Sequence, residues 1–367
     1  MRPHPALFEL AADRPLPAVD DHDELGRSAL EHRMGGLLWS QISNGAIEGP
    51  SEWRERLAGA DLVTRTRHQR LWRTLADVTQ QLAAAGIEVA SFKGVAAERR
   101  WYARVGDRPC ADLDLLLHPD HLDRIDDVVE LIQPGHPLRG RVGALVAQGR
   151  LQSVELQTAG EVSIDLHADA FKLWLPSRRD VVWARVVDVE GPDGVVVRAL
   201  DAEASLVHFL VHLTKDRFRW LLGYADVARV AGTPELDHDF VAWWVRTEGL
   251  DVHYRAALET VARTLDVDVA TPGSRGPRAM AWRAVWRPAI QLRGDEGLVR
   301  FRHRQLWVTL LARGRTGAKV RFLARKLVPV PELIDYRRPA SGSVLRRLTW
   351  GRASDAVRRW RVGRQLR

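Results

Sequence analysis

Two short stretches of alternating polar and apolar residues constrain the fold of this chain more than any other feature. Residues 112–117 read Asp-Leu-Asp-Leu-Leu-Leu, and residues 161–168 read Glu-Val-Ser-Ile-Asp-Leu-His-Ala. Alternate side chains of a β-strand lie on the same face, so each stretch predicts a strand with one apolar face. Asp112 and Asp114 then share the other face of the first strand, and Asp165 and His167 share that of the second.

The runs around these stretches predict a mixed fold, α+β, with helical segments on both sides of a small sheet. Further β-rich runs occur at 87–92, 153–158, 184–189 and 194–199, the last two joined by the turn sequence Gly-Pro-Asp-Gly. Helical periodicity occurs over residues 6–47, 61–85 and 201–244. We therefore predict an N-terminal helical segment (1–60), an α+β core (61–200), a helical domain (201–312) and a helical tail (313–367).

Cysteine content and apolar runs limit the compartment in which this chain of 367 residues is expected. Its single cysteine, Cys110, excludes a disulfide framework and a zinc site with several cysteines, and it suits a reducing compartment. The first residues lack the long apolar stretch of a secretory signal, and no run approaches the roughly 20 apolar residues of a membrane span. We expect a cytoplasmic protein without a transmembrane segment.

The positive charge is concentrated at the C-terminal end of the sequence. The whole chain carries a formal charge of +8, whereas residues 313–367 hold 16 Lys and Arg against three acids, which leaves −5 for residues 1–312. Leucine, valine and tryptophan residues are interspersed among these arginines, which predicts a basic amphipathic helix. Such a helix could lie on anionic lipid, bind RNA, or pack on the acidic body of the same protein.

The pair Asp112 and Asp114 has two interpretations. One is a solvated edge strand with two surface acids. The other is a metal site, because neighbouring carboxylates repel each other unless a cation neutralises them, and oxygen ligands suit Mg²⁺ or Mn²⁺. Asp165 on a neighbouring strand would complete a group of three acids, as two-metal phosphoryl transfer requires.

The context of the acid pair favours the metal site. Lys93 and Gly94 lie between a predicted strand and a predicted helix, where outward-facing backbone amides suit a phosphate. Lys-Gly, Arg-Pro, Asp-Leu-Asp-Leu-Leu-Leu and Ile-Asp-Leu-His, in this order, resemble the uncharacterised bacterial nucleotidyltransferase family of the DNA polymerase β-like superfamily, over roughly residues 65–230.

This resemblance implies a polymerase β-like core that takes a nucleoside triphosphate as donor. It implies that Gly94 lies in the turn that holds the nucleotide, that Asp112 and Asp114 bind Mg²⁺ or Mn²⁺, and that Asp165 is the third acid. The chain departs from the family pattern in having Gly94-Val95 where many members have Gly-Ser or Gly-Gly. A serine hydroxyl for the phosphates is therefore missing, and Lys93 or Arg108 is a candidate to replace it.

Two further cations are candidate nucleotide ligands, each with a structural alternative. Arg108 lies four residues before Asp112 and could contact phosphate, or pair with Asp107 or Asp112 as structural support. Lys215 lies near the end of a predicted helix, beside the aromatic residues Phe218, Trp220 and Tyr224, and could contact phosphate or simply be solvated. An aromatic side chain of this run could stack on the base.

The histidines are weaker candidates. His167 could bind a metal or orient Asp165, but a polar core histidine is the plainer interpretation. His208 and His212 are spaced i, i+4 on a helix, yet the sequence lacks the glutamate of His-Glu-x-x-His, so we interpret them as residues of packing or of a polar interface.

The sequence therefore predicts an Mg²⁺-dependent enzyme that moves a nucleoside monophosphate from an NTP to a hydroxyl or phosphate acceptor on a small molecule, peptide or protein. The alternative is a non-catalytic nucleotide- or nucleic-acid-binding protein that keeps the fold. Three acids in phase favour the enzyme, because negative charge in the cleft does not help a protein that only binds RNA.

Overall fold

The computed structural model describes residues 2–47, 51–171, 178–216 and 218–268, and the single positions 280 and 320. Apart from these two positions, the basic tail predicted for residues 313–367 lies outside the described residues, as do residues 269–312 of the predicted helical domain. Of the described helices, none combines the length and the apolar character that crossing a membrane requires. The predicted α+β class, with helices on both sides of a mixed sheet, is confirmed.

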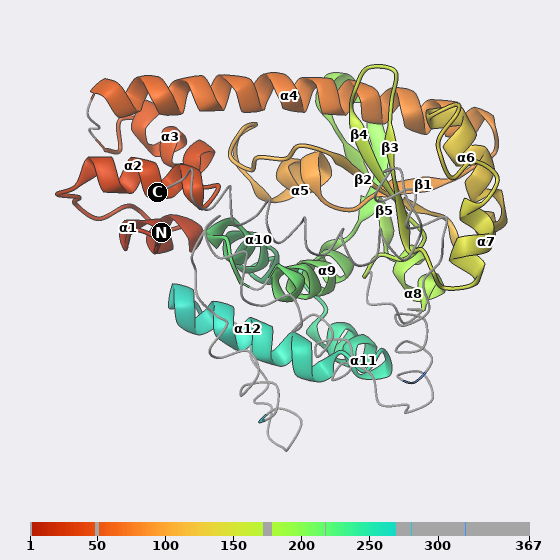
Figure 1. Ribbon diagram of the computed structural model, residues 1–367. Helices are drawn as coiled ribbons and strands as arrows, with labels where there is room; N and C mark the ends of the chain where they lie inside the picture. Colours follow the sequence, from red (N-terminus) through yellow and green to blue (C-terminus); the bar gives the residue numbers. More distant parts are fainter. Residues whose placement is uncertain are drawn as a thin grey trace, which may run out of the picture.

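A long helix connects the N-terminal helices to the sheet (Figure 1). The N-terminal helices are α1 (Ala6–Ala11), α2 (His22–Glu31) and α3 (Gly35–Ser43), and the long helix is α4 (Ser51–Ala84). Helix α4 contacts α2 and α3 as well as α5 (Gly94–Trp101), α6 (Ile125–Ile132) and the sheet. The helix predicted for 61–85 thus begins at Ser51, so the predicted boundary at residue 60 falls inside it.

The sheet has six strands in the order β3-β4-β2-β1-β6-β5. The strands are β1 (Val89–Ser91), β2 (Leu113–Leu117), β3 (Ser153–Gln157), β4 (Ser163–His167), β5 (Val186–Glu190) and β6 (Val196–Leu200). Strand β2 pairs in parallel with β4, as β1 does with β6, and the remaining pairs are antiparallel. All six predicted strands are present, including the hairpin of β5 and β6.

The alternation of side chains assigns the two faces of β2 to two different cores. Leu113, Leu115 and Leu117 pack with α4, α6 and α7 (Val142–Ala147). Leu116 packs on the opposite side, in a core that contains residues of α9 (Ala202–Lys215). Asp114 lies between Leu113 and Leu115 in the sequence and therefore faces the α9 side.

The helices that follow the sheet pack against the N-terminal helices. They are α8 (Arg179–Trp183), α9, α10 (Leu221–Ala231), α11 (His238–Thr247) and α12 (Asp251–Leu265). Helix α1 contacts both α10 and α12, and one apolar core contains residues from α1 to α3 and from α9 to α12. Segments far apart in the sequence thus share one core, and the N-terminal helices lie at the end of α4 away from the sheet (Figure 1).

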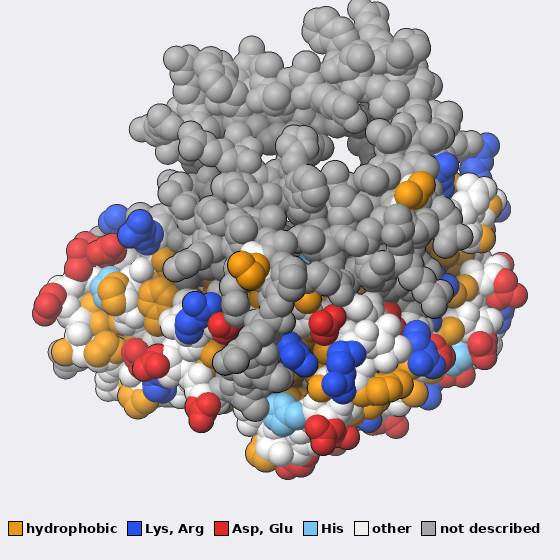
Figure 2. Space-filling view, turned by 90° about the horizontal axis from the view of Figure 1, so that it is seen from below, with side chains coloured by type: hydrophobic (Ala, Val, Ile, Leu, Met, Phe, Trp, Pro, Cys, Tyr) orange, Lys and Arg blue, Asp and Glu red, His pale blue; other side chains and the backbone are white. Residues whose placement is uncertain are grey.

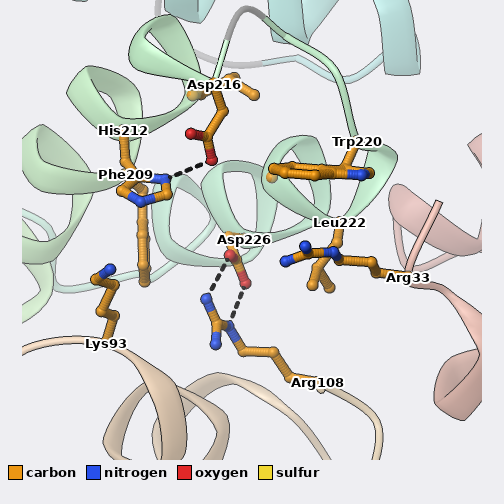
Figure 3. Close-up of a pocket in the computed structure, with 11 residues that line it drawn as sticks. Arg33, Lys93, Arg108, Phe209, His212, Asp216, Trp220, Leu222 and Asp226 are labelled. Carbon is orange, nitrogen blue, oxygen red and sulfur yellow. Dashed lines mark hydrogen bonds and ion pairs between the residues drawn. The ribbon is translucent and has the colours of Figure 1, made fainter. Parts of the chain in front are cut away.

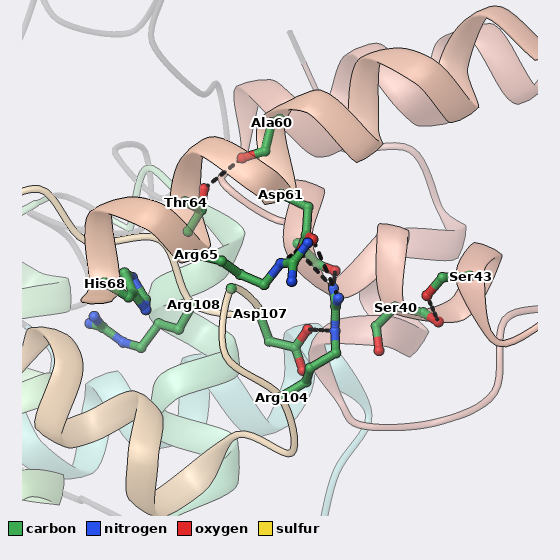
Figure 4. A network of polar contacts seen from close by, with 12 residues as sticks. Ser40, Ser43, Ala60, Asp61, Thr64, Arg65, His68, Arg104, Asp107 and Arg108 are labelled. Atoms are coloured by element: carbon green, nitrogen blue, oxygen red, sulfur yellow. Dashed lines mark hydrogen bonds and ion pairs between the residues drawn. The ribbon is translucent and has the colours of Figure 1, made fainter. Parts of the chain in front are cut away.

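An ion pair between Arg104 and the buried Asp61 carboxylate holds the connection between α5 and β2, residues 102–112, against α4 (Figure 4). The buried Asp61 carboxylate accepts hydrogen bonds from Arg65 Nε at 2.8 Å and from Arg104 Nη2 at 2.7 Å. Gly106 lies so close that an added Cβ would come within 2.8 Å of Asp61 Oδ1, and its φ of +103° also favours glycine. The connection therefore follows one path over α4.

Glu98 holds the same connection from the other side. Its buried carboxylate accepts the backbone N–H of Gly106 at 2.8 Å and that of Arg108 at 3.2 Å, and it hydrogen-bonds His68 Nδ1. His68 Nε2 in turn lies 3.0 Å from the Cys110 sulfur. Glu98 thus satisfies two backbone donors that would otherwise be buried without a partner.

We expect Glu98→Gln to lower the free energy of unfolding by about 1–3 kcal/mol, because the amide keeps one acceptor oxygen but loses the charged contact with His68. Urea denaturation of the full chain measures this. The matched control is Glu55→Gln on α4, where the side chain is exposed, and its effect should stay within about 0.5 kcal/mol. Equal stabilities of the two variants would contradict the structural role of Glu98.

Asp107 predicts a pH dependence of stability. Burial raises the pKa of Asp107 to about 6, although Arg104 opposes the shift. A group whose pKa is higher in the folded state contributes stability that is present at low pH and is lost as pH rises through the folded-state pKa. As pH rises from about 4 to about 7, the wild type should therefore lose up to about 3 kcal/mol of unfolding free energy relative to Asp107→Asn. Denaturation curves across this range measure the difference, and a constant value would contradict the shift.

Candidate functional site

The parallel pairing of β2 and β4 brings two of the predicted acids together. Asp114 is the register partner of Asp165, and Leu116 is that of His167. Since parallel strands in this register present the same phase of alternation, Asp114, Asp165 and His167 lie on one face of the sheet. This is the face that α9 covers.

His167 and Lys93 both contact the Asp114 carboxylate. His167 Nε2 lies 3.0 Å from Asp114 Oδ1 and 3.2 Å from Asp165 Oδ2. Lys93 Nζ lies 2.9 Å from the same Asp114 oxygen. The ring of His167 packs edge-on against Phe92 at a centroid distance of 4.6 Å. The imidazole therefore bridges the two acids from a fixed position, and the Lys93 ammonium neutralises one of them.

The electrostatic surroundings of the two aspartates on β2 are opposite. Burial by itself would raise the pKa of Asp114, but the Lys93 ammonium and the hydrogen bond with His167 outweigh it and hold that pKa well below the ordinary value. Burial and the neighbouring Asp114 carboxylate raise the pKa of Asp112. For Lys93, burial opposes the ammonium form, but Asp114 outweighs it and raises the pKa. The ionised form of Asp114 is thus stabilised by its surroundings, and the ionised form of Asp112 is destabilised.

Asp112 lies beside the acid group rather than within it. Among the described residues, the side chains whose possible ligand atoms all lie within 4.8 Å of one another are Asp114, Asp165 and His167. Asp112 immediately precedes β2 and is half-buried. The carboxylates of Asp114 and Asp165 offer the oxygen ligands that Mg²⁺ and Mn²⁺ prefer, and His167 adds a nitrogen. By donor chemistry these residues fit a divalent cation.

Gly94 begins helix α5 directly beside this group. Its φ of +60° lies in the left-handed region, and an added Cβ would lie 3.4 Å from the carbonyl oxygen of Asp112. A side chain here would be strained. Lys93 is the N-cap residue of α5, and its side chain makes no capping hydrogen bond. The turn thus places a lysine and the first amides of a helix next to the acids.

A pocket adjoins the acid group on the side of α9 and α10 (Figure 3). It is lined by Arg33, Lys93, Arg108, Phe209, His212, Leu213, Asp216, Trp220, Leu222, Gly223 and Asp226. Lys93 belongs to both features, since it lines the pocket and contacts Asp114. A ligand in this pocket would therefore reach the edge of the acid group.

Arg108 reaches the pocket while paired with a residue that the sequence did not indicate. Its Nε and Nη2 donate to the two carboxylate oxygens of Asp226 on α10, at 2.8 and 2.9 Å, and both side chains are buried. Asp226 also accepts from the Tyr102 hydroxyl at 2.6 Å. The structural partner of Arg108 is therefore Asp226, not Asp107 or Asp112.

Of Lys215 and the aromatic residues that follow it, only Trp220 lines the pocket. Lys215 ends α9 and does not line the pocket. Phe218 and Tyr224 are fully buried, and of the three aromatic residues in that run Trp220 lines the pocket. The Trp220 ring lies against two guanidinium groups, those of Arg33 and Arg219, at 3.9 and 4.5 Å from the ring centre.

The two helical histidines have different surroundings. His208 is buried, and its Nδ1 hydrogen-bonds the carbonyl oxygen of Ala170 at 3.0 Å. His212 lines the pocket and pairs through Nδ1 with Asp216 at 3.0 Å. Neither belongs to the possible metal-binding group among the described residues. Their i, i+4 spacing therefore serves packing for His208 and a polar contact for His212.

Nothing in the sequence indicated that Arg33 and Asp226 would line a pocket. Arg33 lies between α2 and α3, and its guanidinium carbon is 3.9 Å from the centre of the Trp220 ring. No local motif marks either residue, because each is brought to the pocket by contacts with segments more than 100 residues away.

The chain matches a protein family over most of its described residues. A family model described as "Uncharacterised nucleotidyltransferase" matches residues 19–266. Among solved structures, the chain is similar to an antigenic nucleotidyltransferase-like protein from Paracoccidioides brasiliensis, with 15% identity, a TM-score of 0.33, and 55% of this chain and 94% of that chain covered. No curated protein matches. The family match spans the sheet, the acid group and all residues that line the pocket.

The opposite surroundings of Asp112 and Asp114 predict opposite effects on the stability of the metal-free protein. Asp114→Asn removes the partner of Lys93 and His167, and should lower the free energy of unfolding by about 3 kcal/mol at pH 7. Asp112→Asn removes repulsion, and should leave stability unchanged or raise it by up to about 1 kcal/mol. Urea denaturation in EDTA measures both, and equal losses in the two variants would contradict this assignment.

Proposed function

Because this chain belongs to the uncharacterised nucleotidyltransferase family, we propose that it transfers a nucleoside monophosphate from an NTP to a hydroxyl or phosphate acceptor in a reaction that depends on Mg²⁺ or Mn²⁺. The observation that carries the proposal is the register pairing of Asp114 with Asp165, beside the Gly94 turn. An acceptor oxygen forms a bond to the α-phosphorus, and the bond to pyrophosphate breaks.

In this proposal Asp112, Asp114 and Asp165 hold the metal. A bound divalent ion supplies positive charge against the triphosphate and favours ionisation of the acceptor. Asp165 lies on the side of Asp114 away from β1, and it takes up the proton of a hydroxyl acceptor. His167, hydrogen-bonded between Asp114 and Asp165, keeps both carboxylates in position.

Lys93 and Gly94 bind the triphosphate in this proposal. Lys93 Nζ contacts Asp114 in the structure, and a divalent ion would compete for the same oxygen. A lysine released from Asp114 has a four-carbon stem with which to follow the phosphates. Gly94 allows the nucleotide to approach the first amides of α5 closely. This division of roles supplies the phosphate contact that a serine after Gly94 would otherwise make.

Arg108 and Lys215 complete the proposed nucleotide contacts. Arg108 donates to Asp226 through Nε and Nη2, so Nη1 is the atom of its guanidinium group that we assign to the ligand. Lys215 lies at the end of α9, three residues after His212 of the pocket, and acts on phosphates over a longer range. The Trp220 ring is not assigned to the base, because the guanidinium carbons of Arg33 and Arg219 lie over it, 3.9 and 4.5 Å from its centre.

The alternative, a non-catalytic nucleotide-binding protein, is favoured by one observation. Lys93 and His167 compensate the buried acids internally, so the site is stable without an ion. Binding of nucleic acid by the described part has less support, because Lys and Arg alternate with Asp and Glu on the face shown in Figure 2. An anionic partner of the basic tail, RNA or lipid, and a cytoplasmic location stay predictions.

Calorimetric titration with an NTP, with Mg²⁺ and with EDTA, separates these possibilities. We expect Mg²⁺ to strengthen NTP binding at least about tenfold in the wild type, because an ion held by the acids would supply positive charge against the triphosphate. Asp165→Asn should abolish this gain and the release of pyrophosphate, while leaving binding in EDTA unchanged. The control is Asp188→Asn on the edge strand β5, where the carboxylate is exposed. NTP binding that is identical with and without Mg²⁺ would contradict the enzyme and favour the alternative.

A further inference from the structure

The charges that line the pocket are paired, except one. Arg108 is paired with Asp226, and His212 with Asp216. Lys93 is paired with Asp114, outside the pocket. Arg33 lines the same pocket, but among the described residues no carboxylate pairs with its guanidinium group, which is held against Trp220. Within the described part of the chain, the pocket therefore carries one positive charge without a carboxylate partner, at Arg33.

The backbone at Arg33 is held in an uncommon conformation. Arg33 has a φ of +61°, in the left-handed region where glycine is favoured, and a longer side chain there costs about 1 kcal/mol. The backbone N–H of Leu222 donates to the carbonyl oxygen of His32 at 3.4 Å, which ties this turn to the start of α10. The residue that precedes α10 is Trp220. One contact between distant segments thus positions both Arg33 and the ring that it covers.

Stacking on Trp220 leaves the guanidinium edge available for a ligand (Figure 3). An arginine that stacks on an aromatic face keeps its hydrogen-bond donors in the plane of the group, directed away from the ring. Such an edge matches the two oxygens of a phosphate or a carboxylate. Trp220 also reduces the side-chain freedom that Arg33 would lose on binding.

We propose that Arg33 is an oxyanion-binding residue, which receives a phosphate or carboxylate group of a ligand that extends through the pocket from Lys93. The oxyanion has two possible sources, the triphosphate of the NTP or an anionic group on the acceptor. Its biological use rests on the proposed function, but the binding itself does not require the metal. The proposal gives the N-terminal helices a place in the site, since they contribute Arg33.

The test uses the full chain and three probes. Inorganic phosphate and pyrophosphate are titrated in EDTA, and a non-hydrolysable α,β-methylene NTP analogue is titrated both with Mg²⁺ and in EDTA. Arg33→Gly removes the guanidinium group and relieves the backbone at a positive φ, so the variant should fold at least as well as the wild type. Arg33→Lys keeps the charge and loses the planar edge. Arg56→Ala is the matched control, because Arg56 also stacks on a tryptophan, Trp53, outside the pocket.

We expect Arg33→Gly to weaken binding of pyrophosphate in EDTA at least about tenfold, Arg33→Lys to weaken it less, and Arg56→Ala to leave it unchanged. An equal loss for the NTP analogue assigns the oxyanion to the NTP. If the analogue binds Arg33→Gly normally, and inorganic phosphate added to the analogue complex binds only the wild type, the oxyanion belongs to the acceptor. Both results support the proposal.

Three results would overturn it: unchanged binding of every probe by Arg33→Gly, an equal loss in Arg56→Ala, or no binding of phosphate and pyrophosphate by the wild type. The titrations with phosphate and pyrophosphate are done in EDTA. Failure of these two titrations therefore refutes the Arg33 site alone. If they succeed while Mg²⁺ leaves binding of the NTP analogue unaffected, the proposed function fails and the oxyanion site stands.

Discussion

The carboxylate of Asp114 is 2% exposed at the centre of the sheet, and the geometry around it follows from the need to compensate a buried charge. Lys93 comes from the turn after β1, and His167 comes from the parallel strand β4. The positive φ of Gly94 lets the chain turn so that Lys93 lies over the acid. A slip of β4 by one residue would direct His167 into the apolar face and leave Asp114 without this partner. The burial of one acid therefore couples the strand register to the turn.

The pocket beside this acid is built by further buried pairs. Asp61 and Glu98 hold the connection that carries Arg108. Arg108 in turn pairs with Asp226 on α10, so the sheet and the helical part are joined by a charge pair at the pocket wall. Because each of these groups already has its partner, this part of the wall is held in place without a ligand. Pre-organisation of this kind reduces the free-energy cost of ordering side chains on binding.

The N-terminal helices are part of the same structure, not an appendage. They share an apolar core with α9 to α12, and α4 runs from them to the sheet (Figure 1). This packing is what brings Arg33 to Trp220, across 187 residues of sequence. The family match begins at residue 19 and so includes this segment, although the motifs that define the acid group all lie between residues 93 and 167.

The local sequence pattern was sufficient to predict the six strands and to single out Asp114 and Asp165, which the structure brings together. Alternation of period two predicted the two strands that carry the acids and their apolar faces, because the face that a side chain takes in a strand depends only on its place in the sequence. The β-rich runs predicted the other four strands, and the Gly-Pro-Asp-Gly turn predicted the hairpin. The order of the motifs was also sufficient for the family, which the family model confirms. The nucleotide and metal roles of these residues stay proposals.

Tertiary structure decided which groups meet. The register between β2 and β4 sets Asp114 against Asp165 and places Asp112 beside them. The partner of Arg108 proved to be Asp226, and Lys93 was found on Asp114. Such pairings depend on which charges become buried together, and burial is a property of the packed chain. Propensity and periodicity act over a few residues, whereas the electrostatic cost of a buried charge is settled by groups that the fold brings from far along the sequence.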